Sequence, residues 1–232
     1  MQAVILAGGL GTRLRPVTEK IPKCMAPVGG KPFLFYLLRL LQARGADEVV
    51  LCTGYLGEQV ETYFGDGRGI GLKLRYSRES AGLLGTGGAL KLAEPLLQHS
   101  FLVVNGDTYV DIDYKAIYRD FSRSNALALI VAAPTAENAR FDLAIDGNLL
   151  VTKYDKANSG GLNYINAGVM GLRRETLSAI PHGQPVSLEA DIFPLLIDRR
   201  QVKAHVTTQP FYDIGSFAGL GIFEKVLKDI SA

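Results

Sequence analysis

The sequence predicts a three-layer α/β/α fold of Rossmann-like type, with a mainly parallel mixed sheet. Through the first 133 residues, short apolar runs alternate with segments of helical period, and strands separated by helices imply right-handed crossovers. A glycine-rich loop directly follows the first apolar run, where open α/β sheets bind their ligands. No linker, repeat or low-complexity tract interrupts the chain, so we expect one domain over residues 1–232.

The first half predicts a regular alternation of elements. We expect strands at residues 3–6, 48–53, 72–77, 101–104 and 126–133, because each is a short apolar run. Helical period predicts helices at 33–44, 56–64, 87–97 and 114–122, and Gly45 is a stop signal for the first of them.

The second half changes character. Residues 141–145 and 149–154 flank Asp146-Gly147, which is a hairpin signal. Further on, we expect strands at 164–172, 202–207 and 211–214, and helices at 188–199 and 217–230. The sequence therefore predicts a more irregular, antiparallel C-terminal part.

Composition restricts the class of partner. The net charge of +2 gives no reason to expect nucleic acid or an acidic membrane, and no apolar run reaches about 18 residues. Two cysteines do not make a disulfide framework, so we expect a reduced, cytoplasmic setting. Three scattered histidines have no ligand spacing, and no zinc site is expected.

The loop in "VILAGGLGTRLRP" (4–16) has the chemistry of a phosphate cradle. Glycines let backbone N–H groups approach phosphate closely, and the fork of Arg13 matches phosphate oxygens. The Walker pattern is absent, and Leu14 stands where the dinucleotide pattern needs its third glycine. Lys23, held between Pro22 and Pro27, adds a point charge.

Together the motifs resemble the signature of the sugar-1-phosphate nucleotidylyltransferases. The matching stretches are "LAGGLGTRLRPVT…PKCMAPV", "LGTGGAL" (84–90), "VVNGDT" (103–108), "YINAGV" (164–169) and "FYDIG" (211–215). The bacterial heptose-1-phosphate guanylyltransferases look most similar, and the muramate phosphate uridylyltransferases and glucose- and mannose-type enzymes less so. Cys24 departs from the usual proline, Asp155 from the usual glutamate, and the stretch 79–84 is one residue longer. With no hexapeptide repeats, no β-helix tail is expected.

The resemblance implies the nucleotide-diphospho-sugar transferase fold and the transfer of a nucleotidyl group from a nucleoside triphosphate to a sugar 1-phosphate. It implies catalytic roles for Arg13, Lys23 and Asp107, and a Mg²⁺ ion held by Asp107 and Asp213. Sugar-phosphate binding falls to Asn105, Asp155, Lys156, Asn166 and Gly168. Nucleotide binding falls to Leu6, Ala7, Gly8, Gly9, Gly11, Thr12, Arg13, Lys23, Glu79, Gly85, Thr86, Gly87, Gly88 and Asn105.

Glu79 favours guanine as the base. A carboxylate is only an acceptor, and guanine presents N1–H and its 2-amino group side by side. Uracil and thymine offer one donor, so GTP is the expected nucleotide. The resemblance to the heptose-1-phosphate guanylyltransferases implies a manno-heptose 1-phosphate as the acceptor. The product would supply lipopolysaccharide, capsule or a surface-layer glycan.

Three alternatives stay open. The chain could be another nucleotidylyltransferase of the same family, specific for mannose or glucose 1-phosphate, or a non-catalytic subunit that binds sugar nucleotides. Retention of Arg13, Lys23, Asp107 and Asp213 argues against the non-catalytic subunit. A nicotinamide-dependent oxidoreductase is disfavoured by the missing third glycine. A homo-oligomer is compatible with the sequence.

Overall fold

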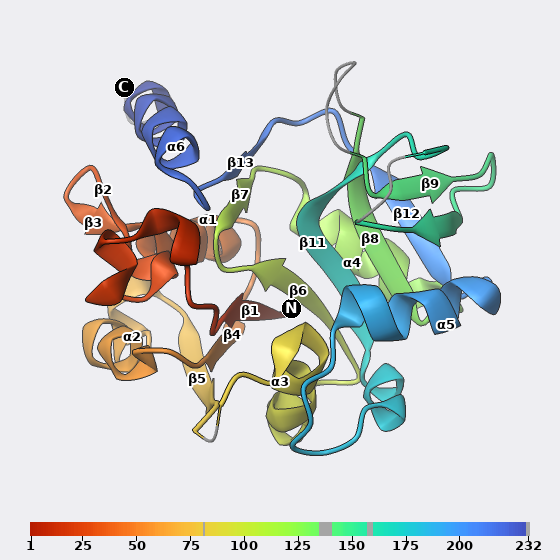
Figure 1. Ribbon diagram of the computed structural model, residues 1–232, viewed down its shortest axis with the longest axis horizontal. Helices are drawn as coiled ribbons and strands as arrows, with labels where there is room; N and C mark the ends of the chain where they lie inside the picture. Colours follow the sequence, from red (N-terminus) through yellow and green to blue (C-terminus); the bar gives the residue numbers. More distant parts are fainter. Residues whose placement is uncertain (81, 135–140, 157–159, 231–232) are drawn as a thin grey trace.

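A seven-stranded mixed sheet forms the centre of the molecule (Figure 1). The computed structural model describes residues 1–80, 82–134, 141–156 and 160–230. The strand order is β12-β8-β11-β6-β1-β4-β5, and β11 runs antiparallel to both its neighbours, whereas the other pairs are parallel. The strands are β1 (Gln2–Ala7), β4 (Glu48–Thr53), β5 (Lys73–Arg78), β6 (Ser100–Asn105), β8 (Ala128–Ala133), β11 (Ile165–Arg173) and β12 (Val202–Val206). The mainly parallel mixed sheet expected from the sequence is confirmed.

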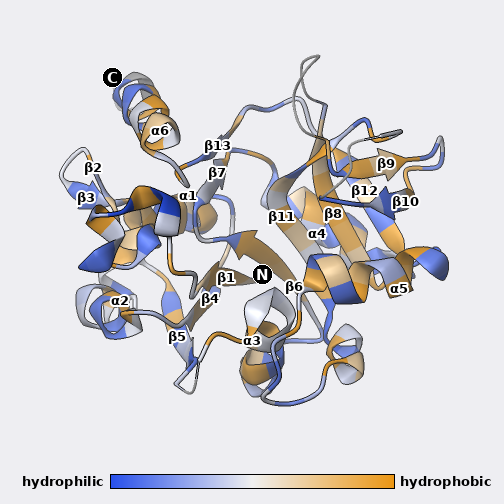
Figure 2. Cartoon of the chain, viewed as in Figure 1, coloured by the Kyte–Doolittle hydropathy of each residue, from blue (hydrophilic) through white to orange (hydrophobic). Residues whose placement is uncertain are grey.

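Helices cover both faces of this sheet because its strands are apolar on both sides. In β1, Ala3 and Ile5 enter one hydrophobic cluster and Val4 enters the other, as the two-residue period of a strand requires. Figure 2 shows hydrophobic residues concentrated along β1, β6 and β8. The first cluster includes α1 (Phe33–Ala43), α2 (Gly57–Phe64), α4 (Tyr114–Arg123) and α6 (Phe217–Ile230). The second includes α3 (Gly85–Ala93) and α5 (Phe193–Asp198), which completes the three layers.

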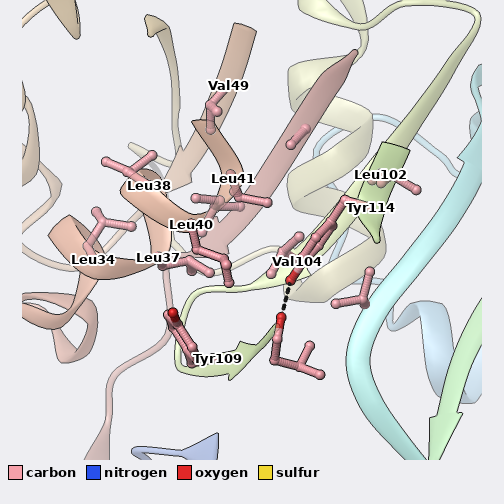
Figure 3. Packing of buried hydrophobic residues seen from close by; sticks show 14 of the residues in the cluster. Leu34, Leu37, Leu38, Leu40, Leu41, Val49, Leu102, Val104, Tyr109 and Tyr114 are labelled. Carbon is pink, nitrogen blue, oxygen red and sulfur yellow. Dashed lines mark hydrogen bonds between the residues drawn. The ribbon is translucent and has the colours of Figure 1, made fainter. Parts of the chain in front are cut away.

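The packing of α1 shows how a helix is fixed to the sheet. Leu34, Leu37, Leu38 and Leu41 recur at helical spacing and are fully buried (Figure 3). Beside them, the buried Tyr114 hydroxyl donates a hydrogen bond to the Val110 carbonyl at 3.0 Å. The polar group of this core residue therefore has a hydrogen-bond partner.

Two predicted helices are shorter than expected, and proline is the reason in both. Instead of one helix at 188–199, the structure has a turn of π-helix, η7 (Leu188–Ile192), and then α5, with Pro194 in its first turn. Instead of 87–97, α3 spans Gly85–Ala93, and a 3₁₀ turn containing Pro95, η5 (Glu94–Leu96), follows it.

The predicted hairpin forms from β9 (Leu143–Ile145) and β10 (Val151–Tyr154), but its turn differs from the expectation. The left-handed residue is Leu149, at φ 58°, rather than Gly147. Asp146 stabilises the turn, because its Oδ1 accepts hydrogen bonds from the amides of Asn148 and Leu150, both at 2.9 Å.

Several short elements near the ligand-binding edge have no counterpart in the prediction. Strand β13 (Phe211–Asp213) does form, but it pairs antiparallel with the unexpected β7 (Thr108–Val110), apart from the main sheet. Three 3₁₀ turns follow β1, namely η1 (Thr12–Leu14), η2 (Val17–Glu19) and η3 (Lys23–Met25). A small hairpin joins β2 (Pro27–Val28) to β3 (Lys31–Pro32).

Across the described ranges, no helix has the length and apolar character to span a membrane.

Candidate active site

A cavity of about 330 Å³ opens at the carboxyl ends of β1, β4, β5 and β6. This is the edge at which open α/β sheets bind ligands, because the strand order reverses direction between β1 and β6. Its lining comprises Leu6, Ala7, Gly8, Gly9, Gly11, Lys23, Cys24, Cys52, Glu79, Leu83, Gly85, Thr86, Ala89, Asn105, Gly106, Asp107 and Glu189. Ten of the fourteen residues expected to bind nucleotide belong to this set. Thr12, Arg13, Gly87 and Gly88 do not.

The glycine loop presents backbone donors to the cavity. In the part of the chain that the structure describes, the amides of Gly9, Leu10 and Gly11 donate no backbone hydrogen bond. A side chain at Gly9 would meet nothing within 4 Å, so the loop leaves open space beside those amides. Successive free N–H groups next to open space make an anion-binding concavity.

Gly11 has a different reason to be glycine. Its φ is +61°, and a Cβ there would lie 2.9 Å from Lys23 Cβ and 2.9 Å from Thr18 Cγ2. The Thr18 hydroxyl also donates to the Gly11 carbonyl at 2.8 Å. Gly11 therefore allows the loop to pack on η2 and η3, which sets the position of Lys23.

Four charged side chains gather beside the loop. The Lys23 ammonium is in direct contact with the Asp107 carboxylate, and both are partly buried. Arg13 Nη2 lies 3.9 Å from Asp213 Oδ2, with 67% of the Arg13 side chain exposed. A Cβ at Gly215 would lie 2.6 Å from Arg13 Nη2 and 2.9 Å from Lys23 Nζ, so the two pairs converge at Gly215. Arg13 thus lies at the site although it is not part of the cavity lining.

Pairing of β7 with β13 brings Asp107 and Asp213 together. Asp213 is in register with Thr108, and the Ile214 amide donates to the Asp107 carbonyl at 2.9 Å. Within the described residues no group of three or more metal-ligating side chains exists. Asp107 lines the cavity, whereas Asp213 lies outside its lining and beside Arg13. The two carboxylates nevertheless fit Mg²⁺, which takes one or two carboxylates and completes its shell with phosphate and water.

Glu79 lies at the end of β5 with its carboxylate at the cavity. Its Oε1 accepts a hydrogen bond from the Leu84 amide at 2.6 Å, and Oε2 faces Gly8 and Gly54. Partial burial raises the pKa of Glu79 above its ordinary value, against the lowering effect of the Leu84 amide. The stretch after Glu79 that looks one residue longer includes residue 81, which lies outside the described residues.

The glycines at the start of α3 divide into two groups. Gly85 and Thr86 line the cavity. The amides of Gly87 and Gly88 instead donate to the Val186 carbonyl, at 2.8 and 3.2 Å, and a Cβ on Gly88 would lie 2.6 Å from the Gln184 carbonyl oxygen. Gly87 and Gly88 therefore allow residues 184–186 to pack directly against α3.

The residues expected to bind the sugar phosphate come from three segments, namely the end of β6, the residues after β10 and the first half of β11. Asn105 lines the cavity, whereas Asp155, Lys156, Asn166 and Gly168 lie outside its lining. The side chain of Asn166 is oriented by two hydrogen bonds, since Oδ1 accepts from the Gly168 amide at 2.9 Å and Nδ2 donates to the Tyr154 hydroxyl at 3.3 Å. Lys156 Nζ lies 5.7 Å from the Tyr154 ring centroid and 3.4 Å from Glu189 Oε1.

The sequence interpretation missed Glu189, a cavity-lining carboxylate only 11% exposed. Its Oε2 accepts from the hydroxyls of Thr86, at 2.6 Å, and Ser187, at 3.0 Å. Burial alone would raise the pKa of Glu189, but the charge of Lys156 and these hydrogen bonds outweigh it, and the pKa is lowered. A predicted amphipathic helix gave no sign that this glutamate would face a ligand.

Cys24 and Cys52 were also missed as lining residues. Burial raises the pKa of each thiol to about 12, so both remain protonated near neutral pH. They therefore behave as small apolar side chains in the cavity wall.

Comparisons with known proteins agree with this geometry. The nucleotidyl transferase family model matches residues 2–225. The chain is 33% identical to D-glycero-alpha-D-manno-heptose 1-phosphate guanylyltransferase of Aneurinibacillus thermoaerophilus, with 93% of each chain covered. It is 35% identical to N-acetylmuramate alpha-1-phosphate uridylyltransferase of Neisseria meningitidis serogroup B, with 95% of each covered. The crystal structure of HddC from Yersinia pseudotuberculosis complexed with GMP-PN has a TM-score of 0.81 at 31% identity, covering 97% of this chain and 99% of that chain. This likeness confirms the expected fold family.

Proposed function

Because this chain belongs to the nucleotidyl transferase family, we propose that it transfers a guanylyl group from GTP to a manno-heptose 1-phosphate. An oxygen of the sugar phosphate attacks the α-phosphorus of GTP, the bond from that phosphorus to the β-phosphate oxygen breaks, and pyrophosphate leaves. The single observation that carries the choice of substrates is the relation to a heptose-1-phosphate guanylyltransferase along 93% of both chains.

The charged groups beside the cavity suit this chemistry. Phosphoryl transfer depends mainly on positioning and on neutralising charge. The free amides of the glycine loop would hold the triphosphate, and Lys23 and Arg13 would offset the charge that develops as pyrophosphate departs. Lys156, with Asn105, Asn166 and Gly168 on the sugar side, would receive the acceptor.

Asp107 and Asp213 would hold Mg²⁺. When bound there, the ion would supply positive charge to the phosphate oxygens. Asp107 is in contact with Lys23, and Asp213 lies 3.9 Å from Arg13, so both carboxylates are next to the cations proposed to hold the triphosphate, which supports this assignment. Removal of divalent cations by a chelator should abolish pyrophosphate release, and added Mg²⁺ should restore it. Full activity after chelation would exclude the ion.

Glu79 would select the base. Partial burial removes water from the Glu79 carboxylate at the cavity and raises its pKa. Two N–H donors of a bound base would replace the hydrogen bonds lost with that water, and guanine supplies such a pair. The GMP-PN complex named for the similar HddC structure also supports a guanine nucleotide.

A uridylyltransferase is the second candidate, because the muramate phosphate uridylyltransferase named above is 35% identical to this chain. Uracil offers Glu79 one donor rather than two, which is the physical reason for ranking GTP first.

The setting of the reaction follows from the same reasoning. The two free, buried thiols of Cys24 and Cys52 support a reducing, cytoplasmic setting. Its product would be a GDP-sugar for a surface polysaccharide such as lipopolysaccharide, capsule or surface-layer glycan.

A pyrophosphate-release assay tests the proposal. GTP, UTP, dTTP, CTP and ATP are each combined with heptose, mannose, glucose and N-acetylmuramate 1-phosphates. The expected result is the highest kcat/KM for GTP with the heptose 1-phosphate. A preference for UTP would favour the uridylyltransferase over the guanylyltransferase. If no pair of substrates released pyrophosphate, the non-catalytic subunit would be the remaining alternative.

A further inference from the structure

Glu189 joins the two sides of the site. Through Oε2 it accepts hydrogen bonds from Thr86, at the nucleotide side, and Ser187. Through Oε1 it pairs with Lys156, at the side expected to receive the sugar phosphate. Thr86 in turn accepts a hydrogen bond from the Leu188 amide at 2.8 Å, which locks η7 onto the start of α3.

Rigid support makes Glu189 suited to hold another side chain. Its carboxylate is 11% exposed and its lowered pKa keeps it ionised at neutral pH. A π-helical turn capped by Ser187, whose Oγ accepts from the Ala190 amide at 3.1 Å, fixes its backbone. In this orientation Oε1 accepts from the Lys156 ammonium at 3.4 Å.

Lys156 needs that support. Its side chain is 54% exposed, and fixing a freely rotating lysine side chain in one place costs rotamer entropy. The Tyr154 ring, 5.7 Å from Nζ, supplies one restraint, and Glu189 supplies a charged one.

From these contacts we propose that Glu189 is a positioning residue, which holds the Lys156 ammonium at the cavity edge until the sugar phosphate takes it over. This inference rests on the proposed function, because it takes Lys156 as the phosphate ligand. A phosphate group carries more negative charge than a carboxylate, so Lys156 exchanges one anion for the other by a short movement. Glu189 thereby favours binding of the acceptor without touching the reacting atoms.

The test compares the change in KM for the sugar 1-phosphate with the change in KM for the nucleotide, both measured in the pyrophosphate-release assay. Glu189→Gln keeps the shape and an acceptor oxygen for Thr86, but removes the charge that attracts Lys156. We expect KM for the sugar 1-phosphate to rise about fivefold to tenfold, with KM for the nucleotide changed less than about twofold. Asp191→Asn is the matched control, since it removes a carboxylate charge from the same π-helical turn, keeps an acceptor oxygen for the Ser187 amide and has no described contact with Lys156; its sugar-phosphate KM should stay within about twofold of wild type.

A double-mutant cycle decides whether Glu189 acts through Lys156. In Lys156→Met, adding Glu189→Gln should cause no further rise in the sugar-phosphate KM. Additive effects, or equal rises for both substrates, would overturn the proposal. The cycle is run with whichever nucleotide and sugar phosphate wild type prefers, so a failed base or sugar assignment is seen in wild type alone. If wild type releases no pyrophosphate, sugar-phosphate affinities from calorimetry replace KM in the same cycle.

Discussion

At the residue scale, two oppositely charged pairs lie beside the glycine loop, where the proposed function requires the triphosphate to bind. Lys23 and Asp107 touch, and Arg13 and Asp213 lie 3.9 Å apart. Each carboxylate has a cation beside it, so loss of one carboxylate changes the charge balance of this group as well as the proposed metal site. Gly215, where the pairs converge, belongs to the FYDIG motif (211–215), but the sequence assigned it no role, although its lack of a side chain is what allows their approach.

Asp107→Asn is expected to lower kcat at least about a hundredfold, because about 3 kcal/mol of charge stabilisation at the metal would be lost. The fold should survive, since Asp107 is only partly buried. Steady-state kinetics with saturating Mg²⁺ measure the effect, and circular dichroism checks the fold. Activity within about tenfold of wild type would remove Asp107 from the metal site.

Glu79→Gln should reduce the preference for GTP over UTP about tenfold to a hundredfold. One guanine donor would face an amide donor, and a lost hydrogen bond to a charged group costs on the order of 1.5–3 kcal/mol. A competition assay between the two nucleotides reads this directly. Unchanged preference would assign base selection to the backbone near Gly85.

The same residue predicts a pH effect. Burial raises the pKa of Glu79, so its carboxyl becomes protonated at a higher pH than the value of about 4.3 typical of glutamate. The proton makes it a donor, and affinity for GTP should fall as the pH drops through that raised pKa. Binding measured by calorimetry across this range should show the loss in wild type and not in Glu79→Gln.

At the element scale, the loop after β1 depends on packing as well as on phosphate chemistry. Gly9 borders open space, whereas Gly11 packs against Thr18 and Lys23. Glycine is therefore required at these two positions of one motif for different physical reasons, and the sequence pattern alone does not distinguish them.

Gly11→Val and Gly9→Ala should therefore behave differently. Gly11→Val forces a branched side chain to φ +61° and against two side chains, so we expect a lower melting temperature and a displaced Lys23. Gly9→Ala should leave the melting temperature unchanged and raise KM for the nucleotide. Differential scanning fluorimetry and kinetics on both variants separate the effects. Equal melting temperatures for Gly11→Val and wild type would contradict the packing argument.

At the scale of the whole molecule, α6 stabilises the strands that carry the two aspartates. Phe223 is fully buried, and its ring centroid lies 5.0 Å from those of Phe33 and Tyr109 and 6.1 Å from that of Tyr212. Tyr109 belongs to β7 and Tyr212 to β13, and α6 lies beside β13 (Figure 1). The C-terminal helix thus packs on the pair of strands that joins Asp107 to Asp213.

Phe223→Ala should cost about 3–5 kcal/mol of stability, because it leaves a large cavity among aromatic rings. Phe223→Leu should cost less, since it fills part of that space. Urea unfolding measures the free energy of unfolding of both variants. The pyrophosphate-release activity should fall more in Phe223→Ala than in Phe223→Leu, because α6 supports the strands next to Asp107 and Asp213. A loss below about 1 kcal/mol for Phe223→Ala would show that α6 does not support the site.

By itself the sequence determined the main-sheet strands and the three layers, because apolar runs and helical periods are local signals that the two-sided sheet needs. It also placed the loop of Gly8–Arg13 and Asp107 at the carboxyl ends of strands, where open α/β sheets bind their ligands.

Only the tertiary structure decided which distant residues meet. Asp213 reaches Asp107 through a β7–β13 pairing that has no local signal, so the sequence linked them by family resemblance alone. Glu189 faces the cavity because a π-helical turn ahead of Pro194 and packing against Thr86 direct it inward, whereas helical periodicity predicts one continuous helix. The physical reason is common to both cases: contacts between segments about a hundred residues apart depend on packing and pairing energies that no short window of sequence contains.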